Sequence, residues 1–81
     1  MTAQVAVEFD LLQLLGHDEE DVLGVEGVPA EGHFPEMVLV YKDAGFGKAL
    51  VFAYDVRRSA DGFQTDYIVR SVVPFNLRAK N

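Results

Sequence analysis

The sequence predicts a small α+β domain, mostly β, in which one short N-terminal helix covers an antiparallel sheet that ends in a C-terminal meander. Three observations predict this class. Two strand-like runs near the C-terminus flank a turn sequence, a third apolar run precedes them, and the N-terminal segment contains apolar residues at helical spacing. A chain of 81 residues builds one hydrophobic core, so we expect a single domain over residues 1–81, with a frayed tail from residue 76.

The N-terminal segment fits two interpretations. Apolar residues alternate over residues 3–9 as in a strand, but from Val5 onward they also recur at the three- and four-residue steps of a helix face. We favour a strand over residues 3–9 and then a short helix with Asp10 as its N-cap and Gly16 as its C-terminal stop. A single helix over residues 2–15 is the alternative. Either arrangement supplies apolar cover for one face of the sheet.

The middle of the chain predicts one strand and one long loop. Residues 25–35 are rich in glycine and proline and form an irregular loop, while residues 21–28 are a weak candidate for an edge strand because two glycines interrupt them. Residues 36–42 are apolar on both alternating faces, as in a central strand covered on each side. Residues 43–47 turn this strand back toward the C-terminal hairpin.

The C-terminal hairpin is the strongest local prediction. Residues 49–57 and 63–73 are strand-like, and Asp61-Gly62 between them is typical of a two-residue type I′ turn. This turn gives one face an almost wholly apolar set of pairs and the other face matched charges. The predicted pairs are Val56 with Tyr67, Tyr54 with Val69, Phe52 with Ser71, Leu50 with Val73, Arg57 with Asp66 and Ala53 with Arg70, with Asp55 diagonal to Arg70.

Charge is distributed unevenly along the chain. Net charge is −6, yet residues 1–40 contain nine acids and no base, because the first base is Lys42. The remaining residues carry four acids against seven bases. An acidic half of this kind indicates either a solvated face or a docking surface for a basic protein partner, which electrostatic attraction would steer toward it.

We therefore predict a partner-binding surface in the acidic half and its loops. Exposed aromatic residues at loop tips would add apolar contacts, and the glycine-flanked Phe46 becomes a contact residue if it is exposed. The predicted partner-binding residues are Asp18, Glu19, Glu20, Asp21, Glu26, Glu31, Phe34 and Phe46.

The sequence offers little catalytic or metal-binding chemistry. The segment from His17 to Asp21 lacks the alternating pattern of a calcium loop, so we expect a hydrated turn, and His33 is expected to pack in its loop. The sequence from Gly45 to Lys48 lacks the spacing of a phosphate-binding loop. No serine and histidine stand at a signature spacing, and we predict no enzyme, no cofactor and no metal.

Nucleic-acid and membrane binding are also disfavoured. Arg57, Arg58 and Arg70 with nearby aromatics resemble a single-strand binding platform, but net charge opposes it and we expect these arginines to pair across strands. No cysteine is present, and two acids interrupt the apolar N-terminus, so we expect a cytoplasmic protein that contacts neither nucleic acid nor membrane.

These observations favour a small acidic protein–protein interaction module, such as an inhibitor or accessory subunit of the kind that mobile elements encode. A carboxylate surface that mimics nucleic acid would require regularly spaced acids on one face. The small core also favours a homo-oligomer. The alternative is a small-molecule or metal-binding domain, as a dimer, that uses His17, His33 and nearby carboxylates.

Overall fold

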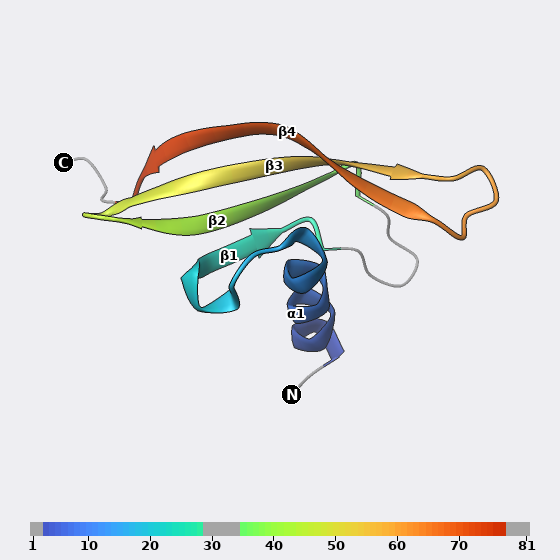
Figure 1. The fold of residues 1–81 in the computed structure, drawn as a ribbon, viewed down its shortest axis with the longest axis horizontal. Helices are drawn as coiled ribbons and strands as arrows, with labels where there is room; N and C mark the ends of the chain where they lie inside the picture. The colour runs from blue at the N-terminus through green and yellow to red at the C-terminus, as the bar shows by residue number, and fades with distance from the viewer. Residues whose placement is uncertain (1–2, 29–34, 78–81) are drawn as a thin grey trace.

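The computed structural model describes residues 3–28 and 35–77 (Figure 1). An antiparallel sheet with strand order β1-β2-β3-β4 lies beside one helix, so strands adjacent in sequence are adjacent in the sheet. The predicted α+β, mostly β class is confirmed. The elements are α1 (Ala3–Leu15), the 3₁₀ helix η1 (Glu19–Asp21), β1 (Val22–Glu26), β2 (Met37–Gly45), β3 (Lys48–Arg58) and β4 (Thr65–Asn76).

The N-terminal segment is a single helix. The favoured strand over residues 3–9 is therefore wrong, and the alternative of one helix is right. Asp10 lies within α1 and not at an N-cap. The two patterns share the same apolar residues. In the structure one helix runs unbroken from Ala3 through Leu11 and Leu12, which pack in the core against the sheet.

Gly16 ends α1 as predicted. Its φ of 83° lies in the left-handed region that favours glycine. Its N–H donates to the Gln13 carbonyl over 3.1 Å, and the N–H of His17 donates to the Leu12 carbonyl over 2.9 Å. These two bonds satisfy carbonyls at the helix end and direct the chain back toward the sheet.

The hydrophobic core lies between α1 and one face of the sheet. Leu11 and Leu12 pack with Val38 and Val40 of β2 and with Tyr54 of β3, and all five side chains are buried. Alternation along the strands places Phe52 and Val56 of β3 on this same face. No helix in the described part of the chain has the length and apolar character that a membrane crossing requires.

The β2–β3 connection is tighter than predicted. Strand β2 continues to Gly45, so the turn is reduced to Phe46 and Gly47, whose φ values are 56° and 73°. Two successive positive φ values are those of a type I′ turn, which matches the twist of a hairpin. Phe46 therefore stands at the tip of this hairpin connection.

The β3–β4 hairpin has the predicted register only near its turn. Val56 pairs with Tyr67, and Arg57 with Asp66, but a bulge between Ala53 and Tyr54 shifts the remaining pairs by one residue. The predicted partners of Phe52, Leu50 and Ala53 are therefore wrong. The observed pairs are Phe52 with Val72, Leu50 with Pro74 and Ala53 with Ser71.

The turn of this hairpin also differs from the prediction. Asp61 has no positive φ, so Asp61-Gly62 is not a type I′ turn. The Gly62 N–H donates to the Ser59 carbonyl over 3.0 Å, and the Asp61 carboxylate accepts from the Ser59 hydroxyl and from the Phe63 N–H. The aspartate thus stabilises a longer connection with its own side chain, which the dipeptide pattern does not reveal.

The bulge changes which side chains share a face. Arg70 is the extra residue on β4, and beyond it the face assignments reverse. Ser71 and Val73 lie opposite Ala53 and Val51, on the face away from α1. The prediction that they join the face of Tyr54 is wrong.

Candidate functional site

The face of the sheet away from α1, here called the open face, is apolar at its centre. Small residues of β3 are buried there: Ala49 is 0% exposed, Val51 9% and Ala53 7%. Since α1 packs on the other side, the side chains of the flanking strands provide their cover. Tyr41 of β2 and Phe75 of β4 meet edge to face, with ring centroids 6.1 Å apart. The open face therefore has an apolar layer but no described helix over it.

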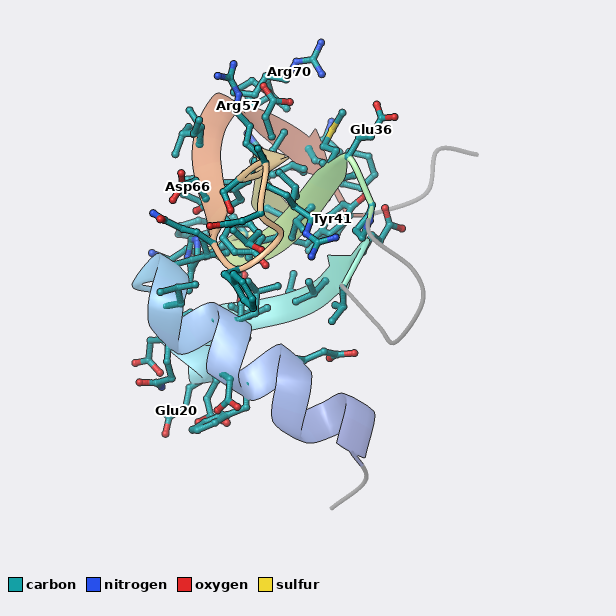
Figure 2. All side chains as sticks on the ribbon, turned by 90° about the vertical axis from the view of Figure 1, so that its right-hand side faces the viewer. Glu20, Glu36, Tyr41, Arg57, Asp66 and Arg70 are labelled. Carbon is teal, nitrogen blue, oxygen red and sulfur yellow. The ribbon has the colours of Figure 1, made fainter. Side chains whose placement is uncertain are left out.

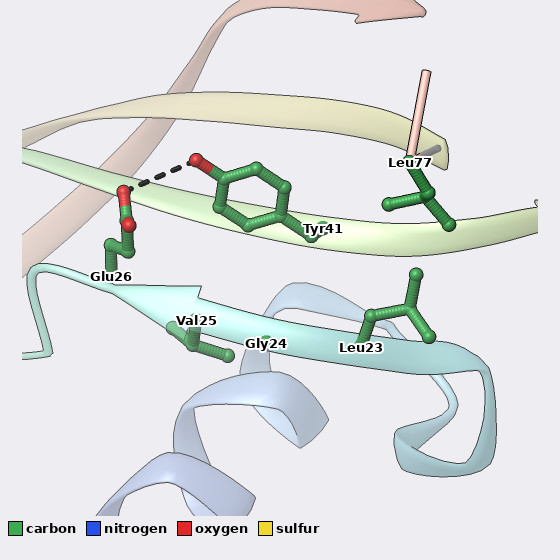
Figure 3. Close-up of a pocket in the computed structure, with 6 residues that line it drawn as sticks. All are labelled: Leu23, Gly24, Val25, Glu26, Tyr41 and Leu77. Carbon is green, nitrogen blue, oxygen red and sulfur yellow. Dashed lines mark hydrogen bonds between the residues drawn. The ribbon is translucent and has the colours of Figure 1, made fainter. Parts of the chain in front are cut away.

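One end of the open face is hollowed between β1 and β2 (Figure 3). This β1–β2 hollow has a volume of about 340 Å³. Gly24 leaves it open, because a Cβ at this position would meet no atom within 4 Å. Side chains of Leu23 and Leu77 lie at one end and those of Glu26 and Tyr41 at the other. The residues that line it are Leu23, Gly24, Val25, Glu26, Tyr41 and Leu77.

Glu26 and Tyr41 form the polar end of the hollow. The Tyr41 hydroxyl donates to Glu26 Oε1 over 3.2 Å (Figure 3). Partial burial, followed by this hydrogen bond and the glutamate charge, raises the pKa of Tyr41 above its ordinary range. Glu26 was a predicted binding residue, and the structure places its carboxylate beside an apolar depression.

The other predicted acids gather on η1, directly before β1. Asp18 is the N-cap, and its carboxylate accepts the Glu20 N–H over 3.1 Å. All four residues from Asp18 to Asp21 are exposed. Figure 2 shows Glu20 below α1, on the opposite side of the molecule from Arg57 and Arg70. Because β1 follows Asp21 at once, this acidic turn directly precedes the strand that carries Leu23.

The predicted aromatic contacts have separate outcomes. Phe46 is 100% exposed, as a contact residue at a turn must be. The Leu77 N–H donates to the Gly47 carbonyl over 2.9 Å, which fastens the Phe46 turn beside the Leu77 end of the hollow. Glu31 and Phe34 lie outside the described residues.

His17 is part of the core. Its Nε2 lies 2.6 Å from the Tyr54 hydroxyl, and its ring meets Phe52 edge to face with centroids 4.7 Å apart. Burial, followed by the charge of Lys42, lowers the pKa of His17 below its ordinary value. Within residues 3–28 and 35–77, no group of three or more potential ligands is placed to hold a metal ion. His33 lies outside these ranges.

The arginines of the hairpin have local partners. Arg70 lies 3.5 Å from Asp55, as the predicted diagonal requires, and Arg58 donates to the Gly62 carbonyl over 2.9 Å. Tyr54, which a base-stacking platform would need at the surface, is 4% exposed. The Arg70–Asp55 contact matches the cross-strand pairing that we expected of the arginines, whereas Arg58 bonds within the turn.

Most of the hollow could not be predicted from the sequence. Leu23, Tyr41 and Leu77 gave no signal, because an apolar residue in a strand ordinarily indicates core. Gly24 weakens the prediction of a strand over residues 21–28, although a glycine within a strand also marks a place that another group can approach closely. The phenol of Tyr54 was expected to be buried, but its hydrogen bond to His17 was not foreseen.

The chain was compared with protein-family models, curated proteins and solved structures, and none of them matches. No family is shown. The geometry of the sheet and its acidic residues is therefore the basis for assigning a function.

Proposed function

We propose that this protein is a small protein–protein interaction module that binds a partner segment with an apolar residue flanked by basic residues. The observation that carries the proposal is the β1–β2 hollow, an apolar depression with a carboxylate at one end, lined by a strand that an acidic turn directly precedes in the chain. The partner's apolar side chain would occupy the space that Gly24 leaves open. Basic residues on each side of it would meet Glu26 and the η1 carboxylates.

The exposed apolar surface supports this proposal. Leu23 is 52% exposed and Leu77 43% exposed, and both line the same hollow. Contiguous apolar surface with a polar rim is typical of a protein-binding site. Charge on the rim contributes specificity and association rate more than affinity, so a basic partner would be selected by the acidic margin.

The module would act by occupying a basic surface of its partner, as an inhibitor or accessory subunit does, and not by catalysis. Absence of cysteine from the sequence supports a cytoplasmic setting for this role.

The test is affinity capture from native lysate at low and at high salt, with two kinds of variant. Gly24→Val fills the hollow in a conformation that a strand residue adopts readily, so it should fold and lose the partner. Replacing Glu19, Glu20 and Asp21 by lysine keeps the Asp18 cap and should reduce capture mainly at low salt. Glu26→Gln removes the carboxylate at the polar end of the hollow and should weaken capture, and Glu36→Gln, at an exposed acid directly before β2, is its matched control.

A partner that wild type and Glu36→Gln retain, but Gly24→Val loses, supports the proposal. A partner that binds Gly24→Val as tightly as wild type contradicts it. Absence of any specific partner at either salt concentration also contradicts it.

A further inference from the structure

Strand β4 is an edge of the sheet whose surface is more apolar than an exposed edge usually is. Within residues 3–28 and 35–77, only β3 pairs with it (Figure 1). None of its residues is buried, although it is rich in large apolar side chains. Five of these are between 44% and 56% exposed: Ile68, Val69, Val72, Val73 and Phe75.

The exposed side chains lie on both faces of β4. Ile68 pairs with Asp55, on the open face, and Val69 pairs with Tyr54, on the face of α1. A partner packed against one face would leave the other face uncovered. A strand added at the edge places neighbours beside β4 on both faces and takes up its outward backbone groups. The geometry therefore favours another strand as the occupant.

Hydrogen bonds of β3 show which groups of β4 point outward. The Val56 N–H donates to the Glu36 carbonyl over 3.0 Å and so points toward β2, away from β4. Opposite residues of an antiparallel pair share both of their hydrogen bonds or neither. Val56 is opposite Tyr67, so the N–H and carbonyl of Tyr67 point to the open edge.

A second hydrogen bond gives the same alternation. The Ser59 N–H donates to the Gln64 carbonyl over 2.9 Å, so this pair is bonded across the hairpin. Alternation along β4 then directs the backbone groups of Asp66 and Ile68 inward and those of Tyr67 and Val69 outward.

We propose that the edge of β4 pairs with β4 of a second copy of this chain, antiparallel, about a two-fold axis at Ile68. In this register Tyr67 is opposite Val69 of the second copy, and the two outward residues exchange both backbone hydrogen bonds. The two-fold axis repeats this pair, and Ile68 lies opposite its own copy. A strand pairs with itself in this way only in the antiparallel sense, which is the isologous contact of a symmetric dimer.

Charge selects this register. Asp66 is opposite Arg70 of the second copy, and the axis generates that pair twice. Asp66, Ile68 and Arg70 share the open face, since Arg70 reaches Asp55, the partner of Ile68. Centring the axis on Asp66 would instead place two carboxylates opposite each other, which is unfavourable.

Pro74 limits the length of the paired segment. Proline has no N–H. Pro74 is opposite Leu50, at a position where the backbone nitrogen points to the open edge, so no hydrogen bond to β3 is lost. It lies beyond the segment from Asp66 to Arg70, so it does not disturb the proposed pairing but prevents its extension. A contact this short buries less than the ~1,600 Å² of a standard interface, so we expect a reversible dimer with a micromolar dissociation constant.

The test is analytical ultracentrifugation of the full chain over a wide range of concentration. Wild type should form a dimer whose fraction rises with concentration. Arg70→Asp alone and Asp66→Arg alone each place like charges opposite each other twice, and each should raise the dissociation constant roughly tenfold or more. An equimolar mixture of these two variants restores both opposite-charge pairs and should form a heterodimer near the wild-type affinity.

Matched controls separate pairing from folding. Lys48→Asp makes the same charge reversal on β3, opposite Asn76 and away from the segment from Asp66 to Arg70, and should leave the dimer intact. Ile68→Lys should abolish the dimer, whereas Phe63→Lys, at a site that is 92% exposed outside the strand, should not. Circular dichroism confirms that each variant is folded.

A monomer at every concentration overturns the proposal, and so does a dimer that survives both charge reversals or a mixture of the two variants that fails to associate. The proposal is independent of the β1–β2 hollow. Gly24→Val should therefore keep the dimer while losing the partner, so the failure of one proposal is distinguishable from the failure of the other.

Discussion

Strands β3 and β4 are two arms of one hairpin, yet they occupy different environments. Strand β3 buries Ala49, Val51, Ala53 and Tyr54, whereas β4 buries none of its residues. Both strands are rich in valine and aromatic residues. The difference comes from position, because β3 has a strand on each side and β4 has one.

This comparison shows that the core is narrower than the apolar surface of the sheet. The buried residues of the cluster come from α1, β2 and Tyr54, and among the described residues of β4 only the partly buried Tyr67 packs against them. The other apolar residues of β4 therefore do little for the monomer and are available for association. The same position in the fold explains why side chains on β3 should matter for stability and those on β4 for binding.

The largest expected effect compares two valines that face each other across the hairpin. Val51 and Val73 are a register pair, but Val51 is 9% exposed and Val73 48%. Val51→Ala should lower the free energy of unfolding by about 2 kcal/mol, because it removes buried methyl groups and leaves a cavity. Val73→Ala should lower it by less than about 0.5 kcal/mol. Urea denaturation measures the free energy of unfolding of both variants, at a protein concentration low enough to exclude dimer. Equal losses of stability in the two variants would refute the contrast between β3 and β4.

A smaller effect is expected from two tyrosines. Tyr54→Phe removes the hydroxyl that pairs with His17 Nε2 and leaves a buried polar atom without its partner. The free energy of unfolding should fall by about 1–2 kcal/mol. Tyr67→Phe, on the edge strand and only partly buried, should change it by less than about 0.5 kcal/mol. Thermal or urea unfolding of both variants decides the point, and a Tyr54→Phe protein as stable as wild type would show that the hydrogen bond contributes little.

The smallest effect is a dependence of stability on pH. Burial and then Lys42 hold the pKa of folded His17 below the 6.5 of the unfolded chain. Its contribution to stability is therefore complete above pH 6.5 and decreases as the pH falls below that value, because the unfolded chain takes up the proton first. Urea unfolding at about pH 8 and about pH 5.5 should show this loss in wild type, and His17→Gln should reduce it. A loss of the same size in His17→Gln would assign it to other groups.

Local signals predicted much of the fold. The Asp61-Gly62 turn sequence located the β3–β4 hairpin, and Gly16 marked the end of α1, because each feature is determined by residues close in sequence. The choice between strand and helix for residues 3–9 failed, since the apolar pattern satisfies both and nothing in the local sequence separates them.

Features that depend on distant parts of the chain were not predictable. The bulge at Arg70 shifts the register by one residue, and nothing in the local pattern marks it. The β1–β2 hollow requires Leu77 to lie near Leu23, which are far apart in sequence. Among the predicted binding residues, Glu26 lines the hollow and Phe46 lies in the turn that is bonded to Leu77. Both positions depend on contacts between distant parts of the chain, which the local sequence does not show.

The proposed dimer requires that β4 is an open edge with outward backbone groups at Tyr67 and Val69. Residue-resolved amide hydrogen exchange by NMR, at a concentration where sedimentation shows monomer, tests it most directly. We expect fast exchange of the amides of Tyr67 and Val69, and slow exchange of the amides of Asp66 and Ile68, because the latter two are hydrogen-bonded to β3. Equally slow exchange at all four amides of the monomer would contradict it.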